Sequence, residues 1–225
     1  MIQFIESELE ILRSQLNEMW SLVYNQLDRA GEAVLTNNRE LASRVIKRER
    51  RVNAFELKID RDIEEVIELY NPVGVDLRFV LAVFKINSNL ERIGDFADSI
   101  AQFVNNNRIP AVDADLYLNL RMTDMVQATL LMLEKAKCAF DEENVELTSQ
   151  IFEKDNLVDE INQEATKVMA AHIKNYPDDA EFCLELTNVI RRLERTGDHI
   201  TNIAEEIVFY VDAKVLKHGS IKSKG

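Results

Sequence analysis

The sequence predicts an all-α protein built as a tandem duplication of a three-helix bundle, with six long helices in all. Two observations predict helices. Apolar residues recur every three or four positions along nearly the whole chain, and no long stretch alternates with the period of two that a strand requires. A third observation predicts the duplication, because the pentapeptide Glu-Arg-x-Gly-Asp occurs at 91–95 and again at 194–198.

Few breaks interrupt the helical pattern, and they divide the chain into its predicted helices. Asn37 is a candidate N-cap, with Glu40 at the spacing of a capping box. Asp141 is a second candidate cap, and Asp178 with Glu181 repeats the capping-box spacing. The predicted helices span 5–36, 38–70, 76–105, 112–140, 142–174 and 178–212.

The two halves of the chain match in sequence. Shifted by 103 positions, residues 79–104 align with 182–207, and nine of these 26 positions are identical. A shift of 106 aligns the earlier helices, and the difference falls in loops, where changes in length are tolerated. A unit of about 100 residues is large enough to bury its own core. The predicted organisation is a first unit over 1–106, a second unit over 107–215 and a flexible tail over 216–225.

The net charge of the chain limits the classes of partner that we expect it to bind. The formal net charge of −13 argues against nucleic acid as a main partner, because phosphates need a basic surface. It suits metal cations or basic patches on proteins, although a need for solubility alone would also explain it.

Cysteine usage and hydropathy indicate the compartment. Cys138 and Cys183 belong to no Cys-x-x-Cys pair, so we expect a reduced, cytoplasmic protein with two buried thiols. The first ten residues have neither the basic start nor the apolar core of a signal peptide. The longest wholly apolar run, at 79–84, is too short to span a bilayer.

Acidic residues recur at helical spacing on the predicted third helix of each unit. Glu91, Asp95 and Asp98 fall within about 60° of one another around the helix axis. The apolar residues lie on the other side, so we expect these carboxylates to point away from the three-helix core. Glu194 and Asp198 take the same places in the second unit.

The preceding helix carries a similar pair. Asp155 and Asp159 are four positions apart, and their counterparts in the first unit are Glu49 and Asn53. Like charges at this spacing repel by a few tenths of a kcal/mol, roughly, which a bound cation would offset. Mg²⁺, Ca²⁺, Mn²⁺, Zn²⁺ and iron all accept carboxylate ligands.

The alternative is an ordinary exposed acidic face, with Arg92 and Arg195 balancing the charge locally. Gly94 and Gly197 each cost about 1 kcal/mol relative to alanine in a helix interior. Close approach of another helix, or of a ligand, would explain both glycines.

Catalysis has little support. The three histidines are His172, His199 and His218, and none belongs to the Glu-x-x-His motif of a di-iron bundle. Phosphate-loop and nucleophile-elbow motifs are also absent from the sequence. We therefore expect a protein that is not an enzyme, with His199 as a surface or packing residue.

Two segments and the duplication resemble the PhoU family of phosphate-signalling proteins, over about residues 5–212. The segments are DLRFVLAVFKINSNLERIGDFADSIA and its echo RRLERTGDHITNIAEEIVFYV. The resemblance implies two three-helix bundles side by side in a cytoplasmic, non-enzymatic regulator. Such proteins couple the ATPase subunit of a phosphate ABC transporter to a sensor histidine kinase, and they restrain both uptake and the phosphate-starvation response. A homodimer is possible.

Some members of that family hold multinuclear iron or zinc clusters on Glu/Asp-x-x-x-Asp motifs. Carried over, the implied ligands are Glu91, Asp95, Asp155, Asp159, Glu194 and Asp198, and the first unit departs from the motif at Asn53, where Glu49 and Asp98 are possible substitutes. We expect the second unit to bind metal more tightly. The alternative functions are a metal-dependent hydrolase that uses the carboxylate clusters, and a metal-storage bundle.

Overall fold

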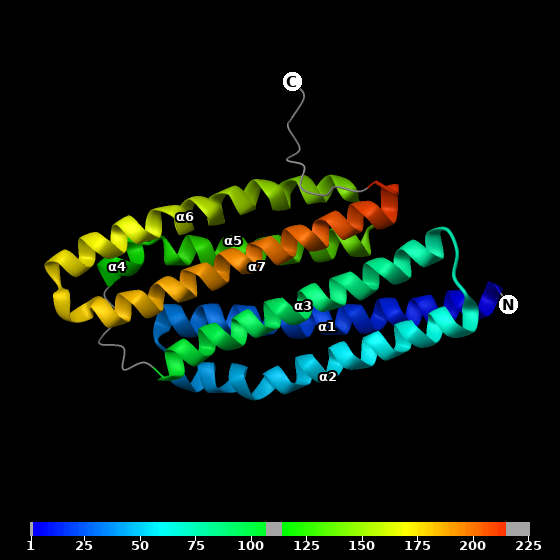
Figure 1. The fold of residues 1–225 in the computed structure, drawn as a ribbon, viewed down its shortest axis with the longest axis horizontal. Coiled ribbons are helices and arrows are strands. Elements are labelled where there is room, and N and C mark those ends of the chain that lie inside the picture. Colours follow the sequence, from blue (N-terminus) through cyan, green and yellow to red (C-terminus); the bar gives the residue numbers. More distant parts are fainter. Residues whose placement is uncertain (1, 107–113, 215–225) are drawn as a thin grey trace, which may run out of the picture.

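A computed structural model describes residues 2–106 and 114–214, and within these ranges it contains helices and no strand. The first unit consists of three long helices that run along the long axis of the molecule (Figure 1). Their bounds are α1 (Ile2–Thr36), α2 (Arg39–Tyr70) and α3 (Val75–Asn106). The all-α prediction is confirmed, and these helices match the predicted ranges closely.

The second unit repeats this arrangement with one extra break. Its elements are α4 (Ala114–Asn119), α5 (Met122–Asp141), the short 3-10 helix η1 (Val145–Leu147), α6 (Thr148–Asn175), a second 3-10 helix η2 (Pro177–Asp179) and α7 (Ala180–Asp212). The single helix predicted over 112–140 is therefore wrong. Arg121 has a left-handed backbone, with φ of 53°, and this conformation separates α4 from α5.

The capping predictions were close but wrong in detail. Asn38, not Asn37, caps α2, and its side chain accepts a hydrogen bond from the Leu41 amide. Asp141 ends α5, while Asn144 caps η1 through the Glu146 amide. The capping box predicted from Asp178 is replaced by η2, whose first residue is Pro177. The predicted boundary at 106/107 and the tail at 216–225 lie outside the described residues.

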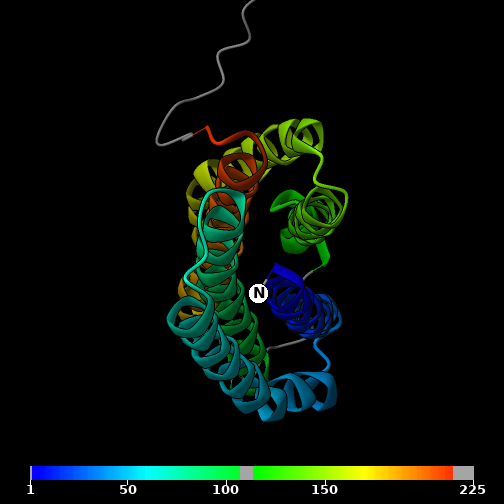
Figure 2. The ribbon, with the colours of Figure 1, turned by 90° about the vertical axis from the view of Figure 1, so that its right-hand side faces the viewer.

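The helices form two layers, which the end-on view shows (Figure 2). One is a curved layer in the order α2, α3, α7, α6, so that the third helices of the two units are its central neighbours. The other layer contains α1 and α5, which lie on the inner side of the curve. The pentapeptides on α3 and α7 are thereby brought to the junction of the units.

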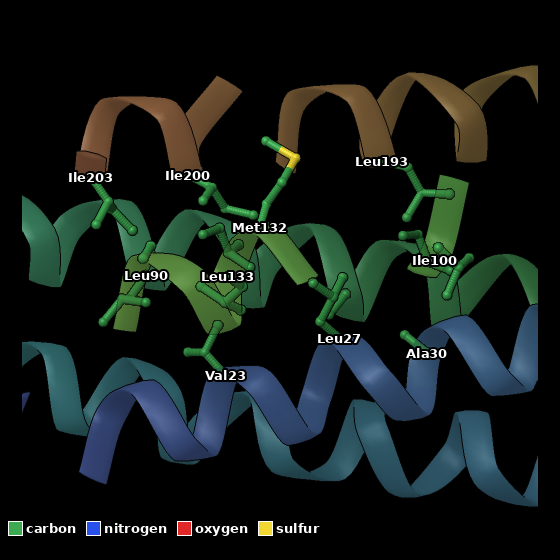
Figure 3. Packing of buried hydrophobic residues seen from close by; sticks show 14 of the residues in the cluster. Val23, Leu27, Ala30, Leu90, Ile100, Met132, Leu133, Leu193, Ile200 and Ile203 are labelled. Carbon is green, nitrogen blue, oxygen red and sulfur yellow. The ribbon is translucent and has the colours of Figure 1, made fainter. Parts of the chain in front are cut away.

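One continuous hydrophobic core fills the space between the layers. Residues from both units contribute to it, among them Leu27, Leu90, Leu133 and Ile200 (Figure 3). We expected each unit to bury a core of its own, but the buried residues of the two units form one shared core. Cys183 is buried as predicted, whereas Cys138 is only half-buried.

Polar contacts also join α1 of the first unit to the second unit, besides the shared core. The buried Trp20 donates its indole N–H to the Leu133 carbonyl at 3.2 Å. Arg13 donates to the Glu143 carboxylate at 2.8 Å, and the Tyr210 hydroxyl donates to the same carboxylate at 2.6 Å. These bonds fix α1 against α5 and α7.

No helix within the described ranges combines the length and the apolar character needed to span a lipid bilayer.

Candidate metal centre

The acidic side chains of α6 and α7 form one electrostatic group in the second unit, which we call the second-unit cluster: Asp155, Asp159, Glu194 and Asp198. Asp155 is its centre. Burial, followed by the neighbouring carboxylates of Asp159, Asp198 and Glu194 in that order of effect, raises the pKa of Asp155 to about 7. The sequence prediction that these four residues lie together is consistent with this coupling.

Asp155 has an oxygen atom with no protein partner. Its Oδ1 is buried and accepts no hydrogen bond from any described residue. Gly197 on α7 provides the space for this carboxylate, because a β-carbon there would lie 2.8 Å from Oδ1 and 3.6 Å from Val158 Cγ1. The glycine inside α7 therefore lets α7 approach α6 at the point where the acidic residues meet.

The two carboxylates of the motif on α7, Glu194 and Asp198, also have raised pKa values. Burial and then Asp198 raise the pKa of Glu194, while Arg195 and Arg191 lower it. Burial and then Asp159 raise the pKa of Asp198. Within the described part of the chain, no lysine or arginine forms an ion pair with any residue of the second-unit cluster, so its negative charge is not neutralised by direct contact.

The first unit holds a corresponding group between α2 and α3, which we call the first-unit cluster: Glu49, Glu91, Asp95 and Asp98. Here the protein supplies its own partners. The Asn53 amide donates to the Glu49 carboxylate, and the Gln102 amide donates to Asp98. Arg92 lies 3.7 Å from a Glu91 oxygen and 3.4 Å from an Asp95 oxygen.

Glu91 is more enclosed than we expected. Its side chain is only 16% exposed, whereas Asp95 is 36% exposed. Glu91 is not part of the hydrophobic core, but it is only partly exposed because the acidic side of α3 lies beside α2. Burial, followed by the carboxylates of Asp95 and Glu56, raises the pKa of Glu91 to about 7.

Glu56 is a member of this acidic surface that the sequence reasoning missed. It lies on α2, and burial followed by the Asp60 carboxylate raises its pKa. Its spacing of seven positions from Glu49 places it two helical turns further along the same side of α2. That spacing could have identified Glu56 as a further acidic residue of this surface from the sequence.

The donor chemistry of the second-unit cluster fits a hard or borderline cation. It offers four carboxylates, one of them with an unpartnered buried oxygen, and Gly197 leaves room beside it. The first-unit cluster also has a buried oxygen without a partner, Asp98 Oδ1. It fits less well because amide and guanidinium groups already occupy several of its other oxygens. In neither cluster do three acidic, His or Cys side chains of the described residues converge closely enough to hold one ion as they stand.

His199 lies between the clusters, at the contact of α3 with α7. Its Nδ1 is 2.8 Å from the Asn89 side-chain oxygen, and its ring centre is 5.6 Å from that of Phe96. Burial, then Arg92 and Arg195, lowers its pKa and favours the neutral ring. The prediction of a packing role for His199 is confirmed.

The repeated architecture has a match among known protein families. The model of the PhoU domain matches the chain twice, over residues 16–104 and 122–207. This chain belongs to the PhoU family. The two matches begin 106 positions apart and end 103 apart, the same two shifts that relate the halves in the sequence.

Known PhoU proteins resemble the chain along nearly its whole length. The PhoU homolog 1 of Thermotoga maritima, named a phosphate-specific transport system accessory protein, is 30% identical over 215 residues, which are 94% of this chain and 90% of that protein. The homolog of Aquifex aeolicus is 31% identical over 218 residues and covers 97% of both chains. The crystal structure of PhoU from Pseudomonas aeruginosa superposes with a TM-score of 0.87 at 27% identity, over 93% of this chain and 99% of that one.

Proposed function

We propose that this PhoU-family protein is a cytoplasmic regulator of phosphate homeostasis. In this proposal it links the ATPase subunit of a phosphate ABC transporter to a phosphate-sensing histidine kinase. It lowers high-affinity uptake and restrains the starvation response when phosphate is plentiful. The observation that carries the proposal is the paired PhoU domain, together with relatives of nearly equal length that are named accessory proteins of phosphate-specific transport systems.

A regulatory role suits the chemistry better than the alternative of a carboxylate-dependent hydrolase. The described histidine and aspartate side chains form one close pair, His172 Nε2 and Asp179 Oδ2 at 3.0 Å. That pair joins the end of α6 to the start of α7, so its position is that of a contact that closes the turn between the two helices. A general base without a positioned nucleophile or substrate site does not make a catalytic centre.

We further propose that the second-unit cluster holds a multinuclear iron or zinc centre, and that the first-unit cluster holds these ions more weakly. A bound metal would supply positive charge that neutralises the carboxylates. Asp155 would use its unpartnered oxygen as a ligand, and Asp159, Glu194 and Asp198 would complete the donor set. The pKa of Asp155, about 7, makes metal and proton compete for the same oxygen near neutral pH.

The proposal is tested with a variant that removes two acidic charges and leaves the hydrophobic core unchanged. The double variant Glu194→Gln with Asp198→Asn should leave the bundle folded, since neither side chain belongs to the hydrophobic core. It should raise a phosphate-starvation reporter in cells given ample phosphate. A matched control is Glu164→Gln with Glu185→Gln, which removes two exposed acids at other positions of α6 and α7.

Three outcomes are informative. A raised reporter in the double variant alone, with an unchanged thermal melt, supports the regulatory surface. A repressed reporter in both variants places that surface elsewhere. A repressed reporter after deletion of the whole gene would contradict the proposed function itself.

A further inference from the structure

Four adjacent cations stand out on a protein of net charge −13. Lys47, Arg48, Arg50 and Arg51 lie in the first half of α2, and all four are exposed. Helical periodicity places Lys47, Arg50 and Arg51 on the side of α2 away from its buried Val45 and Val52, and Arg48 on the flank that faces the groove beside α1. We call these four residues the basic ridge.

The basic ridge is not neutralised by its own protein. Across residues 2–106 and 114–214, no aspartate or glutamate lies within ion-pair distance of any of its four side chains. The one acid inside the segment, Glu49, accepts a hydrogen bond from Asn53 instead. Four unpaired charges so close together repel one another, and an anionic partner would relieve that repulsion.

The fold does not require these cations. The register of the duplication places the ridge opposite residues 153, 154, 156 and 157 of α6, which are Glu153, Lys154, Asn156 and Leu157. Their charges sum to zero, whereas the ridge carries four positive charges. The corresponding helix of the second unit, α6, thus forms without a basic surface at these positions. The ridge is therefore a feature of the first unit alone.

A groove between α1 and α2 adjoins the ridge. Arg48, Arg51 and the half-buried Phe55 line its α2 wall. The α1 wall combines polar residues, including Ser14, Asn17 and Asn25, with Glu18 and the half-buried Leu22. A guanidinium group presents a fork of N–H donors that matches the oxygens of a phosphate. The groove therefore offers two such forks beside an exposed row of charge.

We propose that the basic ridge docks the protein directly on an anionic membrane surface, with Arg48 and Arg51 holding lipid phosphate groups. Each lysine or arginine near such a surface contributes about 1 kcal/mol of attraction, and clusters of roughly four to eight such residues on a helix are typical of binding to anionic lipid. α2 is the end helix of the four-helix layer, with α1 and α3 as its neighbours (Figure 2). The four side chains of the basic ridge on this helix are exposed.

The composition of the surface favours lipid over an acidic protein. Protein interfaces are organised around buried aromatic or aliphatic anchors. Among the described residues between 39 and 51, no large hydrophobic side chain is exposed, and the first one along α2 is Leu57. A layer of headgroups needs no such anchor, because its attraction is electrostatic.

The experiment uses purified full-length protein and lipid vesicles without any partner protein, so it does not depend on the proposed function. The probe is co-sedimentation with vesicles of phosphatidylglycerol and phosphatidylcholine, beside vesicles of phosphatidylcholine alone. We expect binding to the anionic vesicles only, weakened by high salt. The variant with Lys47, Arg48, Arg50 and Arg51 all changed to Gln should bind more weakly by about fivefold per cation, on the order of several hundredfold in total.

A control variant carries the same net charge. It changes Lys58, Arg61, Lys167 and Lys174 to Gln, which are exposed cations outside the ridge. This variant should keep most of the binding, and circular dichroism should show both variants to be helical. Equal losses in the two variants, binding to neutral vesicles, no binding to either vesicle, or tighter binding of an acidic polypeptide or of DNA to the same ridge would each overturn the proposal.

Discussion

The Oδ1 atom of Asp155 lies 2.8 Å from the position that a β-carbon on Gly197 would occupy. The two residues belong to different helices, α6 and α7, and the glycine is the second-unit copy of Gly94. At Gly94 the nearest atom to such a β-carbon is Val52 Cγ1, at 3.0 Å. The same glycine therefore admits an apolar side chain in one unit and a carboxylate in the other.

Gly197→Ala should lower the affinity for metal while leaving the stability of the metal-free protein nearly unchanged. The added methyl group displaces a carboxylate that can rotate, and alanine gains about 1 kcal/mol in helix propensity, so the thermal melt of metal-free protein should change little. The displaced Asp155 should lower the affinity measured by titration with Zn²⁺ or Fe²⁺. Gly94→Ala is the matched control, and an equal loss of affinity in both variants would contradict this reading.

Gly31→Ala should destabilise the fold itself. A β-carbon on Gly31 of α1 would lie 2.5 Å from Val126 Cγ1 of α5, so the helices must move apart. Overpacking of this kind costs about 1–3 kcal/mol, measurable as the free energy of unfolding in urea. Val126→Ala should partly rescue the variant, and a double variant no more stable than the sum of the two single changes would argue against the contact.

Removal of metal should expose a pH dependence of stability. The pKa of Asp155 is about 7 in the folded protein, above its ordinary value near 4, so the folded state holds a proton that the unfolded state releases. This contribution to stability is fully present below about pH 4 and is lost as the pH rises through about 7. Urea unfolding with a chelator present, repeated across this range, should show a weaker decline for Asp155→Asn. Glu164→Gln, an exposed acid on the same helix, should decline as the parent does.

Asp198→Asn should reduce bound metal more than Glu91→Gln does. The reason is that the first-unit cluster is already served by Asn53, Gln102 and Arg92, whereas the second-unit cluster has no such internal partners among the described residues. Metal content is measured on protein purified without an affinity tag. Loss confined to Glu91→Gln would reverse the ranking of the two clusters.

Much of the fold could be predicted from the sequence, because helical periodicity and the similarity of the two halves can both be recognised from the order of the residues alone. The first three helices and the register of the duplication followed from them. The break at Arg121 could not be predicted in this way, since no glycine or proline marks it and an arginine rarely adopts a positive φ. The predicted caps at Asn37 and Asp141 were displaced to Asn38 and Asn144, because neighbouring asparagines and aspartates compete for the same role.

The candidate site was only partly predictable, for a different reason. The spacing identified which helix faces carry carboxylates, but it could not show which oxygens find donors within the protein. Asn53, Gln102 and Arg92 distinguish the clusters through side-chain contacts that depend on rotamers and on the neighbouring helix. The closeness of Gly31 to Val126 depends likewise on how α1 meets α5, which no periodicity within one helix encodes.

Trp20 gives the molecule a built-in optical reporter. It is the single tryptophan of the chain, fully buried, with its indole N–H bonded to Leu133 of the other unit and its ring centre 6.0 Å from that of Phe140. Any event that parts the units would admit water to the indole, and its emission would shift to longer wavelength. Intrinsic fluorescence can therefore follow, without a label, whether metal, lipid or a partner protein opens the junction between the two halves.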